Sequence, residues 1–334
     1  MAQLQLSYAG HRSDRVDDLY LGVVKPEAID LHFVPLPPFQ AFNRFLRGEF
    51  DCGEMSFSTF VIKSAQSKLS GEPLPFVAIP VFPSRTFRHG AIYVNRASGV
   101  TKPEHLTGRR VGVPEYQMTA AVWTRGMLKH QHGVEPKSIA WITGGLERPG
   151  RKPLIDLDYP GINVRHEETK TLNDMLVAGE VDALIAPQMP SAVREQRPQV
   201  GRLFEDLVAV EQAYYRETKL FPIMHTVVLR RDLYMRHPWA AVSLYQAFER
   251  AKDNCLARLR VEEPVPLSLP WSGSLRERTI EMMGEDFWPY GIEKNRKVIE
   301  ALCQYTWEQG LAPIKTEVDD LFAASVVSLA GERL

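Results

Sequence analysis

Cysteine is scarce in this sequence, and its spacing excludes two common ways of stabilising a fold. The 334 residues contain 3 cysteines, Cys52, Cys255 and Cys303, and no two of them form a C-x-x-C pair. This arrangement argues against a disulfide framework and against a zinc site. We expect all three thiols to be reduced and buried in the core.

An excess of charge of one sign is also missing. The formal net charge of −1 gives no general attraction to nucleic acid or to an anionic membrane. No stretch reaches the roughly 18 consecutive apolar residues of a membrane-spanning helix. The first residues, MAQLQLSYAGHRSDRVDD, lack the basic and apolar segments of a secretory signal. The sequence therefore predicts a cytoplasmic protein that binds neither nucleic acid nor a membrane.

Several catalytic motifs are absent as well. The chain has no G-x-x-x-x-G-K-[ST], no G-x-G-x-x-G after a strand, no G-x-S-x-G and no H-E-x-x-H, so nucleotide-binding, serine-hydrolase and metalloprotease functions lack their signatures. No tight spacing of metal ligands occurs, and we expect no metal. A weaker alternative is a metal held by His89, His225, Glu54 or Glu115.

What the sequence does contain is a regular alternation of strands and helices in its first hundred residues. We predict strands at 4–8, 30–34 and 50–54, separated by helices at 15–21 and 39–46. This alternation is typical of an α/β fold with a mostly parallel sheet. Such sheets bind ligands at the carboxyl ends of their strands.

One short pattern occurs twice along the chain. Gly48-Glu49-Phe50-Asp51 and Gly179-Glu180-Val181-Asp182 each combine a helix-ending glycine with the start of a strand. The repeat indicates two similar α/β lobes, although coincidence is a simpler explanation for so short a motif. At 334 residues the chain is long enough for two domains.

Two long strands are expected to connect these lobes, one ending near residue 95 and the other covering about 221–233. If both cross, residues 1–94 and 226–334 form one lobe and residues 95–225 form the other. That layout is typical of a hinged protein that binds its ligand in a cleft between lobes. The glycine-rich segment 143–152 is either a loop that folds over the mouth of the cleft or a plain surface loop.

Polar groups gather where the predicted strands end. A strand, a polar elbow at 115–117 and a helix beginning near Met118 place free N–H groups beside Thr119, where an anion can dock. Arginine forks bind carboxylates bidentately, but Arg85 and Arg88 should point to opposite faces of a strand. We favour Arg85 slightly. The expected binding residues are Ser56, Glu54, His11, Arg85, Arg88, Tyr116, Gln117 and Thr119.

Two histidines, His89 and His225, lie on the predicted crossing strands, where a side chain can touch a ligand from either lobe. An imidazole there could donate or accept a proton near neutral pH. A hydrogen-bonded structural role is the alternative for each. His11, on the first loop, is a third candidate.

Long stretches of the chain resemble one enzyme family. FVAIPVFPSRTFRHGAIYVN, GRRVGVPEYQMTAAVWTRGML, TGGLERPGR, VEQAYYRETKLFPIMHTVVLRRDLYMRHPW and FWPYGIEKNRKVIEAL are similar to the 4,5-dihydroxyphthalate decarboxylase family, from about residue 26 to about 322. The resemblance implies the two-lobed fold of type 2 periplasmic binding proteins. It also implies loss of one ring carboxylate as CO2 from an aromatic dicarboxylate, giving protocatechuate, without a cofactor.

The first loop departs from that family. Family members carry a loop resembling Cys-Gly-Asp-Tyr-Asp-Arg after the first strand, whereas this chain has Ala9-Gly10-His11-Arg12-Ser13-Asp14-Arg15. The identity of the aromatic acid therefore stays open. A cytoplasmic solute-binding or sensing protein that releases the acid unchanged is the main alternative, and a homo-oligomer stays open as well.

The reaction that the resemblance implies needs an acid that protonates a ring carbon. The residues around two histidines suggest which side chain supplies this proton. His225 lies among apolar neighbours in FPIMHTVV, and we assign it as the acid. His89 follows two arginines, whose positive charge should lower its pKa and favour the neutral ring. We assign His89 to draw the proton from a phenolic hydroxyl of the substrate.

Overall fold

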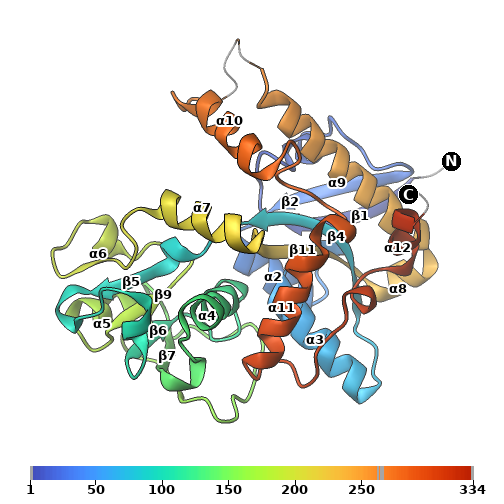
Figure 1. Cartoon of the computed structure of the whole chain (residues 1–334). Helices are drawn as coiled ribbons and strands as arrows, with labels where there is room; N and C mark the ends of the chain where they lie inside the picture. Colours follow the sequence, from blue (N-terminus) through green and yellow to red (C-terminus); the bar gives the residue numbers. More distant parts are fainter. Residues whose placement is uncertain (1–2, 262, 264–266, 332–334) are drawn as a thin grey trace.

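The computed structural model describes residues 3–261, 263 and 267–331, which form two α/β lobes (Figure 1). The strands of the first lobe are β1 (Leu4–Gly10), β2 (Ile29–Pro35), β3 (Cys52–Ser56), β4 (Phe76–Arg85) and β11 (Ile223–Arg230). They form a sheet of order β2-β1-β3-β11-β4, in which β1 runs parallel to β2 and β3, and β11 runs antiparallel to β3 and β4. The short strands predicted in this region are confirmed.

The second lobe has its own sheet. Its strands are β5 (Ile92–Asn95), β6 (Arg110–Val113), β7 (Ala140–Gly144), β8 (Val164–Glu167), β9 (Ala183–Ile185) and β10 (Val200–Arg202). The order is β10-β5-β9-β6-β7-β8, with β5 antiparallel to both of its neighbours and the remaining pairs parallel. The predicted α/β class with two lobes is confirmed.

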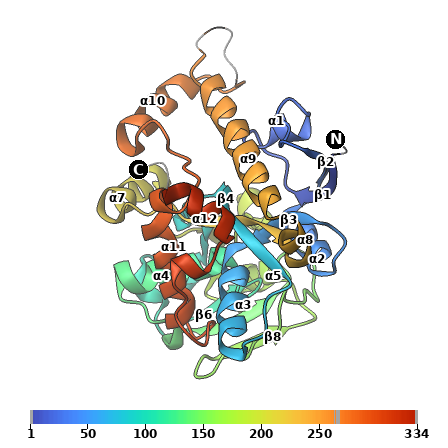
Figure 2. The same cartoon turned by 90° about the vertical axis from the view of Figure 1, so that its right-hand side faces the viewer.

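Helices cover both sheets. Those in the chain segments of the first lobe are α1 (Asp17–Tyr20), α2 (Pro38–Leu46), α3 (Phe57–Ser70), α8 (Arg231–Arg236), α9 (Pro238–Arg258), α10 (Ser272–Met283), α11 (Arg296–Glu308) and α12 (Ala324–Gly331). Those of the second lobe are α4 (Thr119–His132), α5 (Leu172–Ala178), α6 (Ser191–Arg194) and α7 (Leu207–Thr218). The long helix α9 packs against α1, α8 and α12 (Figure 2). Helix α11 packs against both α3 and α4, so it bridges the lobes.

The repeated Gly-Glu-x-Asp pattern has the same structure in both lobes. Gly48 follows α2 with φ +78° and Gly179 follows α5 with φ +72°, a conformation that favours glycine. Each aspartate then accepts a main-chain N–H from a neighbouring strand. The Asp51 carboxylate binds Ser7 on β1 at 2.9 Å, and the Asp182 carboxylate binds Arg110 on β6 at 2.9 Å. The two segments are therefore equivalent structural units.

The passages between the lobes differ from the two continuous strands predicted. Strand β4 ends at Arg85, a short 3-10 helix η1 (His89–Ala91) follows, and β5 pairs only with strands of the second sheet. Strand β11 pairs only within the first sheet. The sheet to which each strand belongs places the two connections between the lobes at residues 86–91 and 219–222. The sequence suggested lobe boundaries at 94/95 and 225/226 instead.

The three cysteines are buried and unpaired, as predicted. Among the described helices, none combines the length and apolar character needed to cross a membrane.

Candidate functional site

A cavity of about 350 Å³ lies between the two lobes. We call it the interlobe cavity. Its lining comes from the β2–α2 turn and α2, the ends of β3 and β4, α3, the first passage, the elbow and start of α4, the loops after β7 and β9, and β11. These residues are Pro37, Pro38, Phe39, Phe42, Ser56, Thr59, Ser84, Arg88, Pro114, Glu115, Met118, Thr119, Ala120, Leu146, Arg151, Leu154, Pro187, Gln188, Met224 and His225.

The first turns of two helices, one from each lobe, meet at this cavity. The hydroxyl groups of Ser56 and Thr119 lie 2.9 Å apart, and the main-chain N–H of Ser58 donates to Thr119 Oγ1 at 3.1 Å. The Ser58 hydroxyl donates to the carbonyl of Gln117 at 2.7 Å. These bonds join the start of α3 to the start of α4. The positive ends of both helix dipoles therefore lie beside the cavity, where they favour an anion.

His225 is held in the cavity wall by a buried carboxylate. Its Nδ1 lies 3.1 Å from Glu54 Oε2, and the Glu54 side chain is 2% exposed against 15% for His225. The other oxygen, Oε1, accepts the main-chain N–H of His11 at 3.2 Å. The Phe42 ring packs edge-on against the imidazole at a centroid distance of 4.9 Å. With Nδ1 directed at Glu54, Nε2 is the ring nitrogen left for a ligand.

Arg88 is the arginine of the first passage that lines the cavity. Its Nε donates to Met224 Sδ at 3.1 Å, and the partly buried position lowers its pKa to about 10 because burial disfavours the charged form. No carboxylate hydrogen-bonds to this guanidinium within the described residues. Arg88 therefore offers a positive charge that an anionic ligand can pair with.

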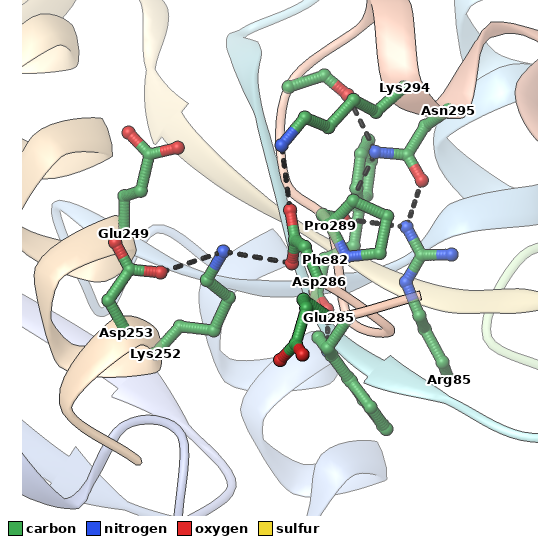
Figure 3. Close-up of polar contacts among 12 residues, drawn as sticks. Phe82, Arg85, Glu249, Lys252, Asp253, Glu285, Asp286, Pro289, Lys294 and Asn295 are labelled. Carbon is green, nitrogen blue, oxygen red and sulfur yellow. Dashed lines mark hydrogen bonds and ion pairs between the residues drawn. The ribbon is translucent and has the colours of Figure 1, made fainter. Parts of the chain in front are cut away.

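Arg85, which the sequence favoured over Arg88, points elsewhere. Its Nη1 donates to the Phe221 carbonyl at 3.1 Å, and its Nη2 donates to the Pro289 carbonyl at 2.9 Å and to Asn295 Oδ1 (Figure 3). Burial lowers its pKa to about 9. The two arginines do point to different sides, as predicted, but the one at the cavity is Arg88. The preference for Arg85 is corrected accordingly.

His89 is not brought together with His225. It lies on η1, is 3% exposed, and packs against the rings of Phe204 and Tyr214 at 5.5 and 5.1 Å. Its Nδ1 has no hydrogen-bond partner among the described residues. Burial, and secondarily the charge of His132, lowers the pKa of His89 to about 4. The 3-10 helix turns this side chain into the second lobe, so the structure gives no geometric support to its expected role as a base.

The elbow residues divide between two environments. Glu115 lines the interlobe cavity and also a second hollow of about 660 Å³, whereas Tyr116 and Gln117 border the second hollow alone. The ring of Tyr116 is covered by the Arg125 guanidinium at 3.7 Å. Gln117 Nε2 donates to the Ile155 carbonyl at 3.1 Å. These two side chains are therefore engaged within the second lobe.

Of the ten residues predicted for the site, the structure places Ser56, Arg88, Thr119 and His225 on the cavity wall, with Glu54 behind His225. The side chain of His11 is exposed, and its main-chain N–H binds Glu54.

Sequence reasoning missed Arg151, Phe39 and Phe42. Arg151 lies in the segment 143–152, for which the sequence left open a loop over the mouth of the cleft or a plain surface loop, and its side chain was not singled out. Phe39 and Phe42 occupy a predicted helix, 39–46, but nothing in the helical pattern indicates that its first turn faces a ligand. Within the described ranges, no cluster of three or more His, Cys, Asp or Glu side chains could hold a metal.

The arrangement of two α/β lobes with a cavity between them is also found in known structures. Over 97% of this chain and 98% of the other, the structure resembles the periplasmic aliphatic sulphonate binding protein SsuA from Escherichia coli, with a TM-score of 0.52 and 13% sequence identity. This likeness establishes the fold, which is that of the type 2 periplasmic binding proteins.

Sequence comparison is more specific. The chain is 37% identical over 325 residues, 96% of its length and 97% of the relative, to 4,5-dihydroxyphthalate decarboxylase from Comamonas testosteroni. It is also 37% identical over 219 residues, 65% of its length and 83% of the relative, to the protein of the same name from Pseudomonas putida. The chain belongs to the 4,5-dihydroxyphthalate decarboxylase family. No family model matches it.

Proposed function

We propose that this protein is a carboxy-lyase that removes one carboxylate from a hydroxylated aromatic dicarboxylate, converting 4,5-dihydroxyphthalate to protocatechuate and CO2. The observation that carries the proposal is the His225–Glu54 pair, which faces a cavity that also contains the cation Arg88. Membership of the decarboxylase family supports the same chemistry.

The cavity suits a flat ring with polar substituents. One wall is apolar and aromatic, formed by Pro37, Pro38, Phe39 and Phe42, and a volume of about 350 Å³ is at the small end of ligand pockets. The lining also includes the hydroxyl groups of the α3 and α4 starts and the guanidinium of Arg88. A single aromatic ring can pack on the apolar residues while its charged groups contact these polar ones.

The reaction needs an acid rather than an electron acceptor. In 4,5-dihydroxyphthalate each carboxylate lies para to a hydroxyl, so a lone pair of the hydroxyl oxygen pushes electron density through the ring onto the carbon that bears the carboxylate. His225 Nε2 donates a proton to that carbon, the bond to the carboxylate carbon breaks, and its electron pair restores the aromatic ring as CO2 leaves. Glu54 orients the imidazole and balances its positive charge.

The carboxylate that stays on the ring needs an anchor. Arg88 and the first turn of α4, with the Thr119 hydroxyl, are placed to bind it. In this scheme the departing carboxylate lies on the side of His225. His89 does not line the cavity, so we do not propose it as the base. The proposed reaction uses no cofactor.

The test is an assay of the purified protein with 4,5-dihydroxyphthalate, following ultraviolet absorbance and released CO2. We expect turnover without added nucleotide, flavin, thiamine or pyridoxal cofactor. The variant His225→Gln should lower kcat about 10²–10⁴-fold, the usual effect of removing a general acid, with little change in binding. His32→Gln, which removes an exposed histidine on β2, is the control.

Two results would contradict the proposal. Tight binding of the acid without CO2 release would favour the alternative of a solute-binding or sensing protein. A His225→Gln variant with the kcat of the unmodified protein would show that the proton comes from another group.

A further inference from the structure

Residues 145–163, which we call the strap, belong to the second lobe and contribute Leu146, Arg151 and Leu154 to the lining of the interlobe cavity. Arg151 on the strap donates from Nε to Glu115 Oε1 at 2.8 Å and also binds this oxygen through Nη2. Its guanidinium lies 4.3 Å over the ring of Phe39, which belongs to the first lobe. Two contacts therefore fix the plane of the guanidinium across the mouth of the interlobe cavity.

Glu115 is fully occupied in holding the strap. Its Oε1 binds Arg151, and its Oε2 accepts the main-chain N–H of Leu154 at 2.8 Å and a longer bond from Gln117 Nε2 at 3.4 Å. The side chain is 4% exposed. Glu115 is therefore a positioning residue for Arg151 rather than a group available to substrate.

The ion pair with Glu115 leaves part of the Arg151 guanidinium available to a ligand. Its Nη1 makes no hydrogen bond to any other described residue, its side chain is 29% exposed, and it lines the interlobe cavity together with Arg88. A guanidinium fork with one free edge and a fixed plane is suited to a carboxylate. The cavity thus contains two arginines in different electrostatic situations: Arg151 is hydrogen-bonded to a carboxylate, whereas Arg88 makes no hydrogen bond to a carboxylate among the described residues and has Glu211 only as a longer-range electrostatic neighbour.

We propose that Arg151 is the residue by which the site selects a dicarboxylate over a monocarboxylate, through binding the carboxylate that departs. This inference rests on the proposed function. Because Glu115 already neutralises much of its charge, Arg151 binds that carboxylate more weakly than Arg88 binds the retained one. A weak hold is what the chemistry requires, since tight binding of the departing anion in the ground state would raise the barrier to its loss.

The test compares two probes that differ by one carboxylate, phthalate and benzoate, by titration calorimetry. Neither has the hydroxyl needed for the reaction, so binding is measured without turnover. The unmodified protein should bind phthalate more tightly than benzoate. Arg151→Met should weaken phthalate binding about tenfold or more and leave benzoate binding within about twofold. Arg88→Met should weaken both.

Two further variants keep the result interpretable. Arg151→Met leaves a buried carboxylate without its partner, so the double variant Glu115→Gln/Arg151→Met, which removes both charges, should show the same loss of preference. Arg148→Met removes an exposed arginine from the same strap and should bind both acids like the unmodified protein.

With turnover, Arg151→Met should raise KM for 4,5-dihydroxyphthalate without lowering kcat, because the lost contact belongs to the ground state. A strap that merely lost its structure would raise KM and also lower kcat. An unchanged preference for phthalate in both Arg151 variants overturns the inference, as does equal affinity for the two acids in the unmodified protein. In either case the proposed function is judged separately by CO2 release. Failure of the unmodified protein to bind either acid would also overturn the inference, and CO2 release from 4,5-dihydroxyphthalate would still decide the proposed function.

Discussion

At the level of single residues, His89 shows how burial, assisted by a neighbouring charge, can set the charge of a side chain. The imidazole packs among aromatic rings, its Nδ1 lacks a partner among the described residues, and its pKa falls to about 4. A histidine in the unfolded chain has a pKa of about 6.5. Between these values the unfolded chain binds a proton that the native protein does not, so native stability falls as pH decreases from about 6.5 to about 4.

This difference predicts the pH dependence of one variant. His89→Phe keeps an aromatic ring in the aromatic pocket and removes the titrating group. Relative to the unmodified protein, the variant should gain about 2–3 kcal/mol of unfolding free energy between pH 7.5 and pH 4.5, as each pKa unit corresponds to about 1.4 kcal/mol. Urea unfolding at the two pH values measures it, with His32→Gln as control. Parallel losses in the unmodified protein and His89→Phe would show that His89 titrates normally.

The sequence could not show which of two similar residues, Arg85 or Arg88, lines the cavity. Strand periodicity separated Arg85 from Arg88 correctly, but it could not say which of the two faces the ligand. That outcome depends on η1, which interrupts the expected strand, and on irregular pairing of β11 with β4 between Ile223 and Val227. Both features change side-chain directions in a way that alternation of apolar residues does not reveal.

At the level of elements, the starts of α3 and α4 act together as a connection between the lobes. Thr119 Oγ1 is bonded to the Ser56 hydroxyl and accepts the main-chain N–H of Ser58, and all three residues are buried. Closing the lobes therefore satisfies a donor that would otherwise need water. The same contacts orient the two helix ends that are proposed to attract the substrate anion.

Thr119→Val tests this connection. The substitution keeps the branched shape but leaves the Ser58 N–H buried without its acceptor, which should lower the free energy of unfolding by about 1–3 kcal/mol. Thr124→Val on the same helix is the control, because the Thr124 hydroxyl donates only to the Ala120 carbonyl one turn earlier and its loss should cost about 1 kcal/mol or less. Denaturant unfolding of the two variants gives the comparison. Equal losses would show that Thr119 contributes no more than an ordinary helix hydroxyl.

Elements with a clear period were predictable, and those without one were not. The strands of the first lobe and the repeated Gly-Glu-x-Asp units follow from apolar spacing and from the helix-ending glycines. The strap has no repeating pattern, so nothing local indicates that Arg151 reaches Phe39 of the other lobe. Its position depends on Glu115, which is distant in sequence and is brought near only by the fold.

At the level of the whole molecule, the C-terminal segments tie the two lobes together. Helix α11 packs on α4, and the Arg125 Nε donates to Gln309 Oε1 at 2.9 Å while Gln309 Nε2 donates to the Val122 carbonyl at 2.9 Å. The assignment of residues 226–334 to the first lobe, made from the order of elements, does not anticipate this contact. Periodicity identifies an apolar face of α11 but not the surface that covers it.

Arg85 also makes hydrogen bonds to the C-terminal segment. Its guanidinium joins the second passage, at Phe221, to the C-terminal segment at Pro289 and Asn295. That segment is fixed in turn by Asp286, which accepts from Lys252 at 3.3 Å and from Lys294 at 2.8 Å (Figure 3). Arg85 therefore connects the second passage to the C-terminal segment of the first lobe, and it does not line the interlobe cavity.

The two neighbouring arginines should consequently have opposite effects when each is changed to methionine. Arg85→Met leaves buried acceptors unpaired and should lower the free energy of unfolding by about 2–4 kcal/mol, with KM within about twofold. Arg88→Met should raise KM about tenfold or more, because a charged contact to substrate is lost. It should change stability by less than about 1 kcal/mol, since the one hydrogen bond of the Arg88 side chain among the described residues goes to sulfur and burial disfavours its charge. Urea unfolding and initial rates on both variants separate the two roles, and each variant is the control for the other. A raised KM in Arg85→Met with unchanged stability would restore Arg85 as the substrate ligand.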